Sequence, residues 1–518
     1  MTLRRRKGHK ALAMAVAVGA AACFGRTALA LDYYVDPSYG GINGAAYTAP
    51  NGANYAGAYN SVAAALGASG VSSGVSVANP NRIYFAAGTY NVGTTTLSYS
   101  KNNVDLIGLT GNANDVVITS SLDAAYNSGS GTLGTTNCST LQLKGNNVSA
   151  ANITFANSTD TPYIDNVVHK ALTPSGTYTG NSQTATAPAV ALLVQGDGNV
   201  FNNVRVLGYQ DSLYLKTGRV SITNSYISGD NDFIFAFGTV VIANSTINID
   251  GDHAGGCVTA ASTDKRTSNG FVFLNDTIQS NSVQGNSVID PNGAASATGA
   301  AANSMYLGRP WGWQQSGGDA SAVYINTKMT SAISSAGWTT WAANENTVNT
   351  SLNGGNPGED SRFAEYNSMD LTGSPLTTSG RVSWSHQLSA SQAAAYTMQN
   401  VFASEYNSST NPNGYAWYGL GYPAGDNAPG SGLADTNPSY SWPAFWGPRN
   451  YANVGTGSSA DNITGNPSAY SDPSWTLGGN YDPSAQLALL PEPASAGMLA
   501  GVVGMLLCRR RDKARGKT

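Results

Sequence analysis

Two aspartates, Asp211 and Asp232, hold equivalent places in a repeated phrase of the sequence and could form a catalytic pair. Each lies eight residues after an asparagine that begins an Asn-x-x-apolar phrase, Asn203 for the first and Asn224 for the second. If each phrase belongs to one layer of a stacked β-structure, the two carboxyl groups lie one strand spacing apart, about 4.8 Å. Carboxyl groups that close cannot both ionise freely, so one can act as a nucleophile or base and the other as an acid. Aspartate is also common in turns, so the spacing alone allows a structural role for either residue.

Basic residues are scarce enough in this chain to be examined one by one. Charged residues make up 11% of the 518 residues, against about 25% in an average soluble protein. Residues 31–508 carry 14 Lys and Arg but 29 Asp and Glu, a net charge near −15. Arg309 lies there in a Gly-Arg-Pro-Trp phrase, and a guanidinium beside an aspartate favours the ionised carboxylate that a nucleophile requires. The negative charge also argues against a nucleic-acid-binding protein, which needs a basic face.

The Asn-x-x-apolar phrase repeats along the middle of the chain and predicts the architecture. Its copies are 51, 21, 20, 31 and 51 residues apart and begin at Asn152, Asn203, Asn224, Asn244, Asn275 and Asn326. Apolar and polar residues alternate beside the copies, as in Val220-Ser-Ile222, which is the pattern of a β-strand. Periods of about 20–50 residues with few helix signals favour a parallel β-helix, in which stacked asparagines can form an amide ladder. A β-sandwich with Asn turns is the alternative.

The two ends of the chain carry the features of export and sorting signals. Residues 1–30 combine a basic start, an apolar run and a small-residue cleavage pattern, which predicts a signal peptide. Residues 490–518 contain Pro-Glu-Pro, a short apolar run and three arginines, an order that resembles the PEP-CTERM sorting signal of Gram-negative bacteria. This resemblance implies an exosortase-type processing enzyme as a partner, and an exported protein at the cell surface or outside the cell. An uncleaved anchor at either end is the alternative, although both apolar runs are short for a membrane span.

The region between the repeats and the tail gives fewer signals. Residues 388–402 predict a short helix that closes the solenoid, with a serine N-cap at 389 or 391. Residues 403–489 are rich in Gly, Pro, Ser and Asn and predict a spacer, although they also contain four tryptophans. Cys138 and Cys257 are the two cysteines outside the terminal signals, and the sequence leaves open whether they form a disulfide.

Three blocks of sequence around the aspartate pair resemble the pectin methylesterase (pectinesterase) family. They are Gly208-Tyr-Gln-Asp-Ser-Leu-Tyr214, Gly229-Asp-Asn-Asp-Phe-Ile-Phe235 and Leu307-Gly-Arg-Pro-Trp311, in this order. The resemblance implies an all-β fold, a right-handed single-stranded parallel β-helix over residues 31–402. It also implies hydrolysis of the methyl esters of pectin (homogalacturonan), with release of methanol and without a metal or organic cofactor.

The same resemblance implies roles for individual residues. Asp232 is expected to be the nucleophile that forms an acyl-enzyme. Asp211 is expected to protonate the departing methanol and then to activate water. Gln210 is expected to donate to the oxyanion, and Arg309 to hold Asp232 ionised and oriented. The expected substrate-binding residues are Trp311, Phe235 and Trp313.

Two positions depart from the family pattern. Pro188 stands where a second oxyanion-hole glutamine is usual, so a donor is missing unless Gln183 or another residue of the preceding loop replaces it. Ala236 stands where the family prefers Gly. The alternatives are therefore an esterase or thioesterase for another substrate, a calcium-dependent pectate lyase, and a non-catalytic surface protein that binds glycans. The negative net charge further predicts that neutral, highly esterified pectin binds better than its acidic product.

Overall fold

The computed structural model describes residues 30–126, 131–159, 188–250, 255–263, 269–280, 299–311, 320–340, 361–404, 483–488 and 490. Within these residues, no helix combines the length and the apolar character needed to cross a membrane. The predicted signal peptide and sorting tail lie outside them, apart from Ala30 and Leu490, and so do residues 405–482 of the predicted spacer.

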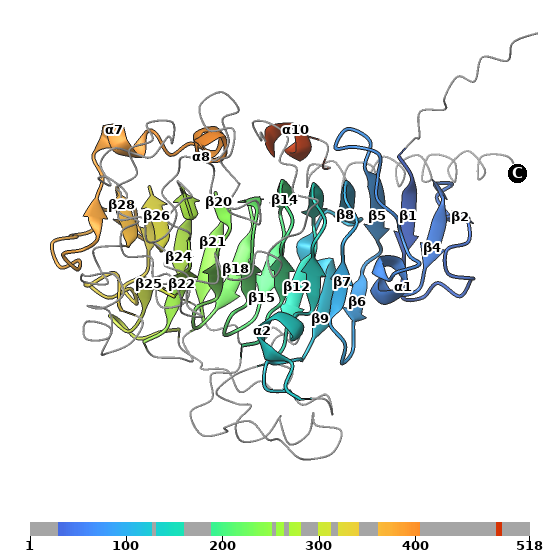
Figure 1. Ribbon diagram of the computed structural model, residues 1–518, viewed down its shortest axis with the longest axis horizontal. Coiled ribbons are helices and arrows are strands. Elements are labelled where there is room, and N and C mark those ends of the chain that lie inside the picture. Colours follow the sequence, from blue (N-terminus) through green and yellow to red (C-terminus); the bar gives the residue numbers. More distant parts are fainter. Residues whose placement is uncertain are drawn as a thin grey trace, which may run out of the picture.

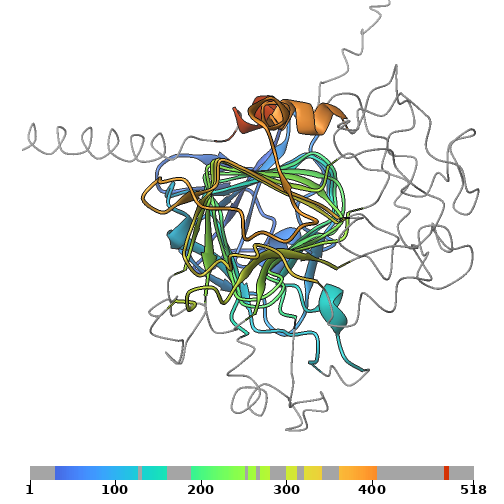
Figure 2. The ribbon, with the colours of Figure 1, turned by 90° about the vertical axis from the view of Figure 1, so that its left-hand side faces the viewer.

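The described chain winds into a right-handed parallel β-helix, as the sequence predicts (Figure 1). A coil passes through three parallel sheets in turn, of twelve, nine and seven strands, and each strand pairs with its counterparts in the neighbouring coils. Seen along the axis, the coils superimpose around a common interior (Figure 2).

The strands of each sheet follow one another in chain order, one per coil, except that β4 pairs at the far side of β1. The twelve-stranded sheet consists of β1 (Asp32–Val35), β4 (Gly57–Tyr59), β5 (Asn81–Phe85), β8 (Val104–Gly108), β11 (Val148–Ala151), β14 (Asn199–Asn202), β17 (Arg219–Thr223), β20 (Thr239–Ala243), β23 (Phe271–Leu274), β26 (Ser321–Ile325), β28 (Arg362–Tyr366) and β30 (His386–Gln387). The nine-stranded sheet consists of β6 (Gly88–Asn91), β9 (Val116–Ser120), β12 (Thr154–Asn157), β15 (Arg205–Leu207), β18 (Tyr226–Gly229), β21 (Thr246–Ile249), β24 (Thr277–Gln279), β27 (Lys328–Met329) and β29 (Met369–Asp370). The seven-stranded sheet consists of β7 (Leu97–Tyr99), β10 (Leu141–Leu143), β13 (Leu192–Val194), β16 (Leu213–Leu215), β19 (Ile234–Ala236), β22 (Cys257–Ala261) and β25 (Tyr306–Pro310).

The remaining described elements are short. The hairpin strands β2 (Tyr47–Thr48) and β3 (Asn54–Tyr55) and helix α1 (Val62–Leu66) lie at the N-terminal end. A 3₁₀ helix, η1 (Ala113–Asp115), and helix α2 (Gly134–Asn137) interrupt the early coils. Helices α7 (Ala390–Ala393), α8 (Met398–Ser404) and α10 (Pro483–Leu487) follow the coils.

Aligned apolar side chains fill the interior of the solenoid. One inward column of the twelve-stranded sheet runs, in register, through Ile83, Leu106, Ala150, Phe201, Ile222, Ile242, Phe273 and Tyr324. The Phe273 and Tyr324 rings stack with centroids 4.2 Å apart. The next residue in the column is the buried Glu365, whose charge is paired in two hydrogen bonds with Arg381, at 2.8 and 3.0 Å. The alternation of apolar and polar residues therefore separates the interior from the surface as expected.

The repeated asparagines all form the turn between the twelve-stranded and the nine-stranded sheet. All six have a left-handed backbone, with φ between 51° and 62°, a conformation that asparagine tolerates better than most residues. Three amide-to-amide hydrogen bonds join neighbouring coils at this corner, from Asn203 to Asn152 at 2.8 Å, from Asn326 to Asn275 at 3.0 Å, and from Asn367 to Asn326 at 3.0 Å. The predicted amide ladder is thus present over part of the stack.

The predicted helix over residues 388–402 is divided into two, which corrects the sequence-based expectation. Helix α7 begins at the Ser389 N-cap, where Ser389 and Gln392 form a reciprocal capping box, but it ends after one turn at Ala393. Helix α8 begins at Met398. Tyr396, Val401 and Phe402 pack on outward-facing residues of the twelve-stranded sheet, including Val241. The segment therefore covers a side wall of the solenoid (Figure 1).

Helix α10 returns to the middle of the same side wall. Gln486 donates a 2.6 Å hydrogen bond to the hydroxyl of Ser149 on β11. Leu487 and Leu490 pack against Ala151 on β11 and Val200 on β14. This end of the predicted spacer is thus docked on coils that lie far earlier in the chain (Figure 1).

Candidate functional site

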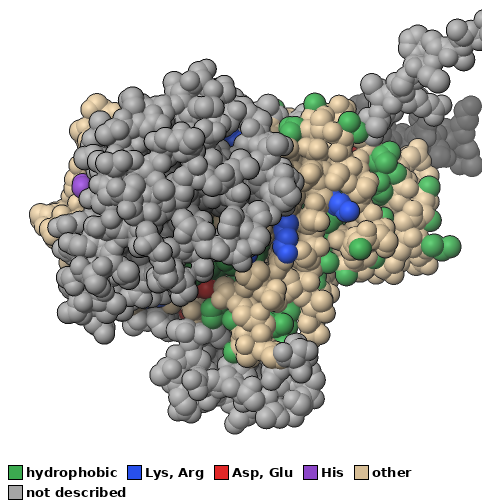
Figure 3. Space-filling model, in the orientation of Figure 1, with side chains coloured by type: hydrophobic (Ala, Val, Ile, Leu, Met, Phe, Trp, Pro, Cys, Tyr) green, Lys and Arg blue, Asp and Glu red, His purple; other side chains and the backbone are tan. Residues whose placement is uncertain are grey.

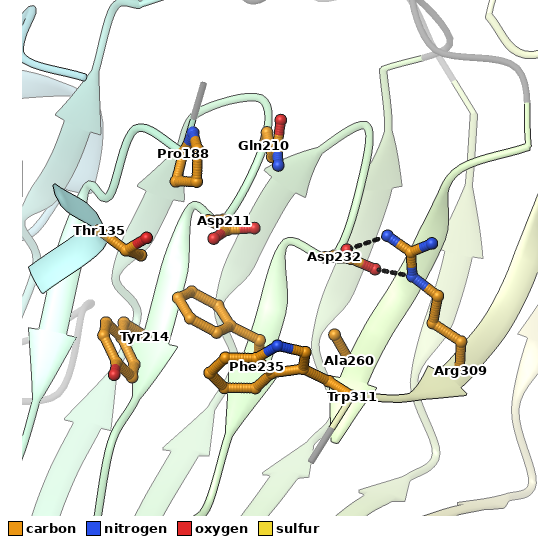
Figure 4. Close-up of a pocket in the computed structure, with 10 residues that line it drawn as sticks. All are labelled: Thr135, Pro188, Gln210, Asp211, Tyr214, Asp232, Phe235, Ala260, Arg309 and Trp311. Carbon is orange, nitrogen blue, oxygen red and sulfur yellow. Dashed lines mark hydrogen bonds and ion pairs between the residues drawn. The ribbon is translucent and has the colours of Figure 1, made fainter. Parts of the chain in front are cut away.

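Asp211 and Asp232 occupy the turn that leads into the seven-stranded sheet, on two adjacent coils. The preceding residues, Gln210 and Asn231, form a parallel bridge, and the Asp211 amide donates to the Asn231 carbonyl at 3.1 Å. Both aspartates have a left-handed backbone, with φ of 61° and 51°. The eight-residue offset from Asn203 and Asn224 therefore places the two carboxyl groups side by side, as the repeat predicts (Figure 4).

Arg309 on β25 binds Asp232 through two parallel hydrogen bonds. Nε donates to Oδ1 at 2.9 Å and Nη2 donates to Oδ2 at 2.5 Å. Burial alone would lower the pKa of Arg309, but its bond to Asp232 and the negative charge there raise it. A bidentate guanidinium contact fixes the plane of the carboxylate and stabilises its negative charge.

Asp211 lies in a different electrostatic environment from Asp232, although it is its neighbour. It is 8% exposed. Burial raises the pKa of Asp211 well above its ordinary value, and the charge of Asp232 raises it further. Arg309 opposes this shift, and Asp230 adds to it. One coil therefore holds a charged carboxylate and the next a carboxyl group that keeps its proton to a higher pH.

An aromatic floor lies beside the two carboxyl groups. The Tyr214 and Phe235 rings stack at 4.3 Å, and Trp311 meets Phe235 edge to face at 5.8 Å. Tyr214 and Phe235 are equivalent residues of neighbouring strands, β16 and β19, and both face outward because their neighbours in sequence face the core. Trp311 is partly exposed, so its indole face can meet a ligand.

The carboxyl groups and the rings line one cleft, with a cavity volume of about 350 Å³. Its lining residues are Thr135, Pro188, Gln210, Asp211, Tyr214, Asp232, Phe235, Ala260, Arg309 and Trp311 (Figure 4). All six of the expected site residues that the structure describes therefore line one cleft: Gln210, Asp211, Asp232, Phe235, Arg309 and Trp311. Trp313 and Gln183 lie outside the described residues.

Several residues that line the cleft were not predicted as site residues from the sequence. Tyr214 could have been found, because it alternates with the inward Leu213 and Leu215 within a matched block. Thr135 could not, because helix α2 reaches the cleft from a different coil and has no repeat of its own. Among the described residues, no three His, Cys, Asp or Glu side chains are arranged to hold a metal ion.

Pro188 lies at the edge of the cleft and offers it no donor. Its carbonyl accepts from the Ala124 amide at 2.8 Å and from the Cys138 thiol at 3.2 Å. Cys138 and Cys257 are both buried free thiols, so the disulfide left open by the sequence does not form. Burial raises the pKa of each thiol, which leaves neither as a ready nucleophile.

Comparison with known proteins agrees with the motifs. The Pectinesterase family model matches residues 167–405. A pectinesterase of Ralstonia solanacearum is 35% identical over 198 residues, which are 36% of this chain and 40% of that protein. Pectinesterase 31 of Arabidopsis thaliana is 30% identical over 269 residues, 52% of this chain and 64% of that protein. The matches thus span less than two thirds of these two relatives, and they support the pectinesterase family for this chain.

Longer matches come from a further relative and from a solved structure. Pectinesterase A of Dickeya dadantii is 29% identical over 353 residues, 64% of this chain and 85% of that protein. Pectin methylesterase PemA from Erwinia chrysanthemi superimposes with a TM-score of 0.51 at 26% identity, covering 72% of this chain and 97% of that one. A pectin methylesterase in complex with a hexasaccharide matches equally well.

Proposed function

We propose that this protein is a carboxylic ester hydrolase, a pectin methylesterase that removes methyl groups from homogalacturonan. One observation carries the proposal: a carboxylate held by a bidentate arginine lies beside a buried carboxyl group of raised pKa, in an open cleft with an aromatic floor. The family model and the pectinesterases to which the chain is similar support the same reaction.

In the first half of the reaction, the Asp232 carboxylate attacks the carbonyl carbon of the methyl ester. The negative charge that forms on the carbonyl oxygen is stabilised by the side-chain amide of Gln210. The tetrahedral intermediate collapses as Asp211, in its protonated form, gives its proton to the departing methoxy oxygen. Methanol leaves, and the galacturonyl group stays joined to Asp232 as an anhydride.

In the second half, water replaces methanol. The Asp211 carboxylate takes a proton from the water, whose oxygen attacks the anhydride carbonyl on the sugar side. The C–O bond to Asp232 breaks and returns that residue as the carboxylate paired with Arg309. The sum is one ester and one water converted to one carboxylic acid and one methanol, and Asp211 ends protonated for the next cycle.

Among the described residues that line the cleft, Gln210 supplies the one side-chain amide, because Pro188 has none. Thr135 lies across the cleft from Gln210 and carries a hydroxyl group (Figure 4). A missing oxyanion donor lowers kcat by about 10²–10³ in other hydrolases, so we expect a slow enzyme. A non-catalytic glycan-binding protein is the second candidate, and the absence of a donor at Pro188 is the observation that favours it.

The proposal also covers the other segments of the chain and the place where the enzyme acts. Residues 1–30 act as a signal peptide, 31–402 as the catalytic β-helix, 403–489 as a spacer and 490–518 as a PEP-CTERM-like tail read by an exosortase-type enzyme. These assignments rest on sequence patterns alone. They place the enzyme outside a Gram-negative-type cell, where it would modify plant cell-wall pectin.

Methanol release from highly methylated pectin tests the proposal. The full chain is assayed with EDTA present, beside an Asp232→Asn variant of the same fold and size. Release by the parent chain and none by the variant is the expected result. Equal methanol release by both excludes the aspartate mechanism. Cleavage of the polymer chain that EDTA abolishes, without methanol release, points to a lyase. Polymer binding without chain cleavage or methanol release favours the glycan-binding protein.

A further inference from the structure

A row of polar side chains crosses the outer side of the twelve-stranded sheet, away from the candidate cleft. In register, Asp32 on β1 pairs with Arg82 on β5, and Arg82 pairs with Asp105 on β8. Asp105 pairs in turn with Ser149 on β11. Asp105 faces outward, because the next residue, Leu106, belongs to the core. The row therefore leads from the N-terminal coils to the coil on which helix α10 is docked.

The exposure of these side chains falls toward the helix. The side chain of Asp32 is 42% exposed, that of Arg82 27% and that of Asp105 4%, and Ser149 is fully buried. Residues 483–490, which form the strap, contact this end of the row, because Gln486 donates to the Ser149 hydroxyl at 2.6 Å. Asp105 is thus buried at the end of the row where the strap lies.

The hydrogen bonds around Ser149 leave two buried oxygen atoms without a donor. The Ser149 oxygen accepts from Gln486, and its own proton can be donated to Asp105. Among the described residues, neither Oδ2 of Asp105 nor Oε1 of Gln486 has a hydrogen-bond partner. Arg82 Nε is 3.7 Å from Oδ2, which is too long for a hydrogen bond. An ionised carboxylate and an amide oxygen only accept, so a proton on Asp105 supplies a donor that this cluster lacks.

The groups near Asp105 act on its ionisation in opposite directions. Burial raises the pKa of Asp105 to about 6, and the charge of Asp32 raises it too. The charge of Arg82 and the hydrogen bond from Ser149 lower this pKa, but they do not outweigh burial. Burial raises the pKa of the neighbouring Tyr84 to about 12, so this ring stays neutral while Asp105 titrates.

The strap brings no charge to this cluster. Residues 483–490 contain no acidic or basic residue, and Asp482 and Glu492 beside them in the sequence lie outside the described residues. Basic side chains are also few on the described face in Figure 3. Among the described residues, Arg82 is the cation that pairs with Asp105. An uncharged segment that covers a carboxyl group binds best when that group is neutral, because burial penalises the charged form.

We propose that residues 483–490 are a pH-sensitive strap, held on the side wall of the solenoid when Asp105 is protonated and released when Asp105 is ionised. Docking takes the carboxyl group of Asp105 out of water, so ionisation favours the released state. The raised pKa of Asp105 means that its contribution to docking is fully present below the ordinary aspartate pKa and is lost as pH rises through about 6. The docking constant should therefore fall by up to about tenfold between pH 5 and pH 8.

The strap is next in sequence to the proposed sorting tail. The Pro-Glu-Pro sequence begins at Pro491, directly after Leu490. Acid therefore keeps the start of this tail attached to the solenoid, and neutral or alkaline pH frees it for the processing enzyme. This consequence rests on the proposed assignment of the tail, whereas the pH dependence of the strap does not.

Hydrogen–deuterium exchange of the full chain tests the strap directly. Protection factors, which correct for the intrinsic pH dependence of exchange, are measured at pH 5 and pH 8 for the peptide that contains residues 483–490. We expect protection in the parent chain to be up to about tenfold lower at pH 8. Asp105→Asn keeps the shape of the side chain and cannot ionise, so its strap should be equally protected at both pH values.

A second buried carboxyl group supplies the matched control. Asp276 is also buried, and burial raises its pKa well above the ordinary value. It lies between β23 and β24, where the Ser245 amide donates to it at 2.6 Å. Asp276→Asn should therefore leave the pH dependence of the strap as it is in the parent chain. Equal changes in strap protection in the parent chain and in Asp105→Asn overturn the proposal.

Two further comparisons separate release of the strap from other events. Leu487→Ala/Leu490→Ala removes apolar contacts of the strap with β11 and β14 and shows the exchange of a released strap. A parent strap that exchanges as fast as this variant at pH 5, or that is equally protected at pH 5 and pH 8, overturns the proposal. Exchange of β17 in the same samples reports the solenoid itself. A strap that loses protection only together with β17 also overturns the proposal.

Discussion

Two corners of the same solenoid use one backbone conformation for different purposes. At the first corner, Asn203 and its equivalents turn the chain with φ near 50–60°, and neighbouring amides hydrogen-bond to each other. At the second corner, Asp211 and Asp232 turn the chain with the same φ. An amide both donates and accepts, so stacked asparagines satisfy each other, whereas stacked carboxylates repel.

The contrast between asparagine at one corner and aspartate at the other shows how a structural repeat can hold a catalytic pair. The left-handed turn places one short polar side chain per coil in the same direction. The strand spacing then sets its distance from the equivalent side chain of the next coil. With asparagine this arrangement stabilises the stack. With aspartate it separates two proton affinities, provided that an arginine neutralises one member, as Arg309 does for Asp232.

Asp211→Asn replaces a carboxyl group at the second corner, the proposed catalytic corner, with an amide like those of the first corner, the structural corner. We expect kcat to fall by about 10²–10⁴, because Asp211 is the proposed acid and base. The raised pKa of folded Asp211 contributes stability below its unfolded pKa, and that contribution is lost as pH rises through the folded pKa. The unfolding temperature of the variant relative to that of the parent chain should therefore rise as pH rises. Methanol release and thermal unfolding at pH 5 and pH 8 measure both effects, and a relative unfolding temperature that stays level or falls between these pH values contradicts the contrast.

Pro188→Gln adds a second side-chain amide to the cleft, where Gln210 supplies the one amide among the described lining residues. We expect kcat to rise by about tenfold or more, since a second oxyanion donor can contribute 10²–10³. The measurement is kcat on highly methylated pectin, with KM recorded separately. Pro188→Ala is the control for backbone effects, and an equal gain in both variants would mean that the amide does not reach the oxyanion.

Asn203→Ala tests the structural corner. Alanine at a φ of 52° is strained by about 1–2 kcal/mol, and it loses the hydrogen bonds of the Asn203 amide to Asn152 at 2.8 Å and to the Gly111 carbonyl at 3.2 Å. We expect the free energy of unfolding to fall by about 2 kcal/mol, with kcat unchanged. Asn203→Gly keeps the turn and loses only the two side-chain hydrogen bonds, so its free energy of unfolding should fall about half as much, as measured by denaturant unfolding. Equal losses in the two variants would show that the turn is not the source of stability.

Asp230→Asn removes a negative charge beside Asp211 and leaves every residue with a proposed catalytic role in place. The negative charge of Asp230 is one of the causes of the raised pKa of Asp211. Removing it should lower that pKa, so activity should be lost at a lower pH on the alkaline side. The pH profile of kcat measures the shift. A profile that moves toward higher pH, or not at all, contradicts the assignment of Asp211 as the acid.

Ala236→Gly tests a further residue with positive φ, which follows the cleft residue Phe235 in β19. Ala236 has a φ of 98°, a value that glycine adopts without strain and alanine does not. This gives a physical reason for the family's preference for glycine at this position. Relief of about 1–3 kcal/mol of strain offsets the loss of a buried methyl group, near 0.8 kcal/mol. Glycine also loses about 0.5–1 kcal/mol more backbone entropy on folding, so we expect the free energy of unfolding to rise by at most about 1.5 kcal/mol. Ala243→Gly, in the regular strand β20, should instead destabilise.

The sequence predicted what the repeat itself determines. The solenoid, the Asn corner and the pairing of Asp211 with Asp232 all follow from one spacing rule, because a constant offset keeps a residue in one column of every coil. Arg309 came from a different signal, the scarcity of basic residues, and the structure places it on Asp232.

Features that join distant segments could not be predicted in this way. The capping residue Ser389 was found, but the break between α7 and α8 was not, because it follows from packing against Val241 and its neighbours. The contact of Thr135 with the cleft and the docking of Gln486 on Ser149 also depend on tertiary packing. No local pattern records such contacts.

The docking of α10 has a consequence for how the molecule unfolds. A solenoid whose coils touch only their neighbours is nearly one-dimensional, and such a stack frays from its ends one unit at a time. The return of residues 483–490 to β11 and β14 joins the last part of the described chain to coils formed hundreds of residues earlier. This closes a loop across the stack. The coils between the two contact points should therefore unfold together. The contact of α10 with β11 and β14 can form only after α10 has been synthesised.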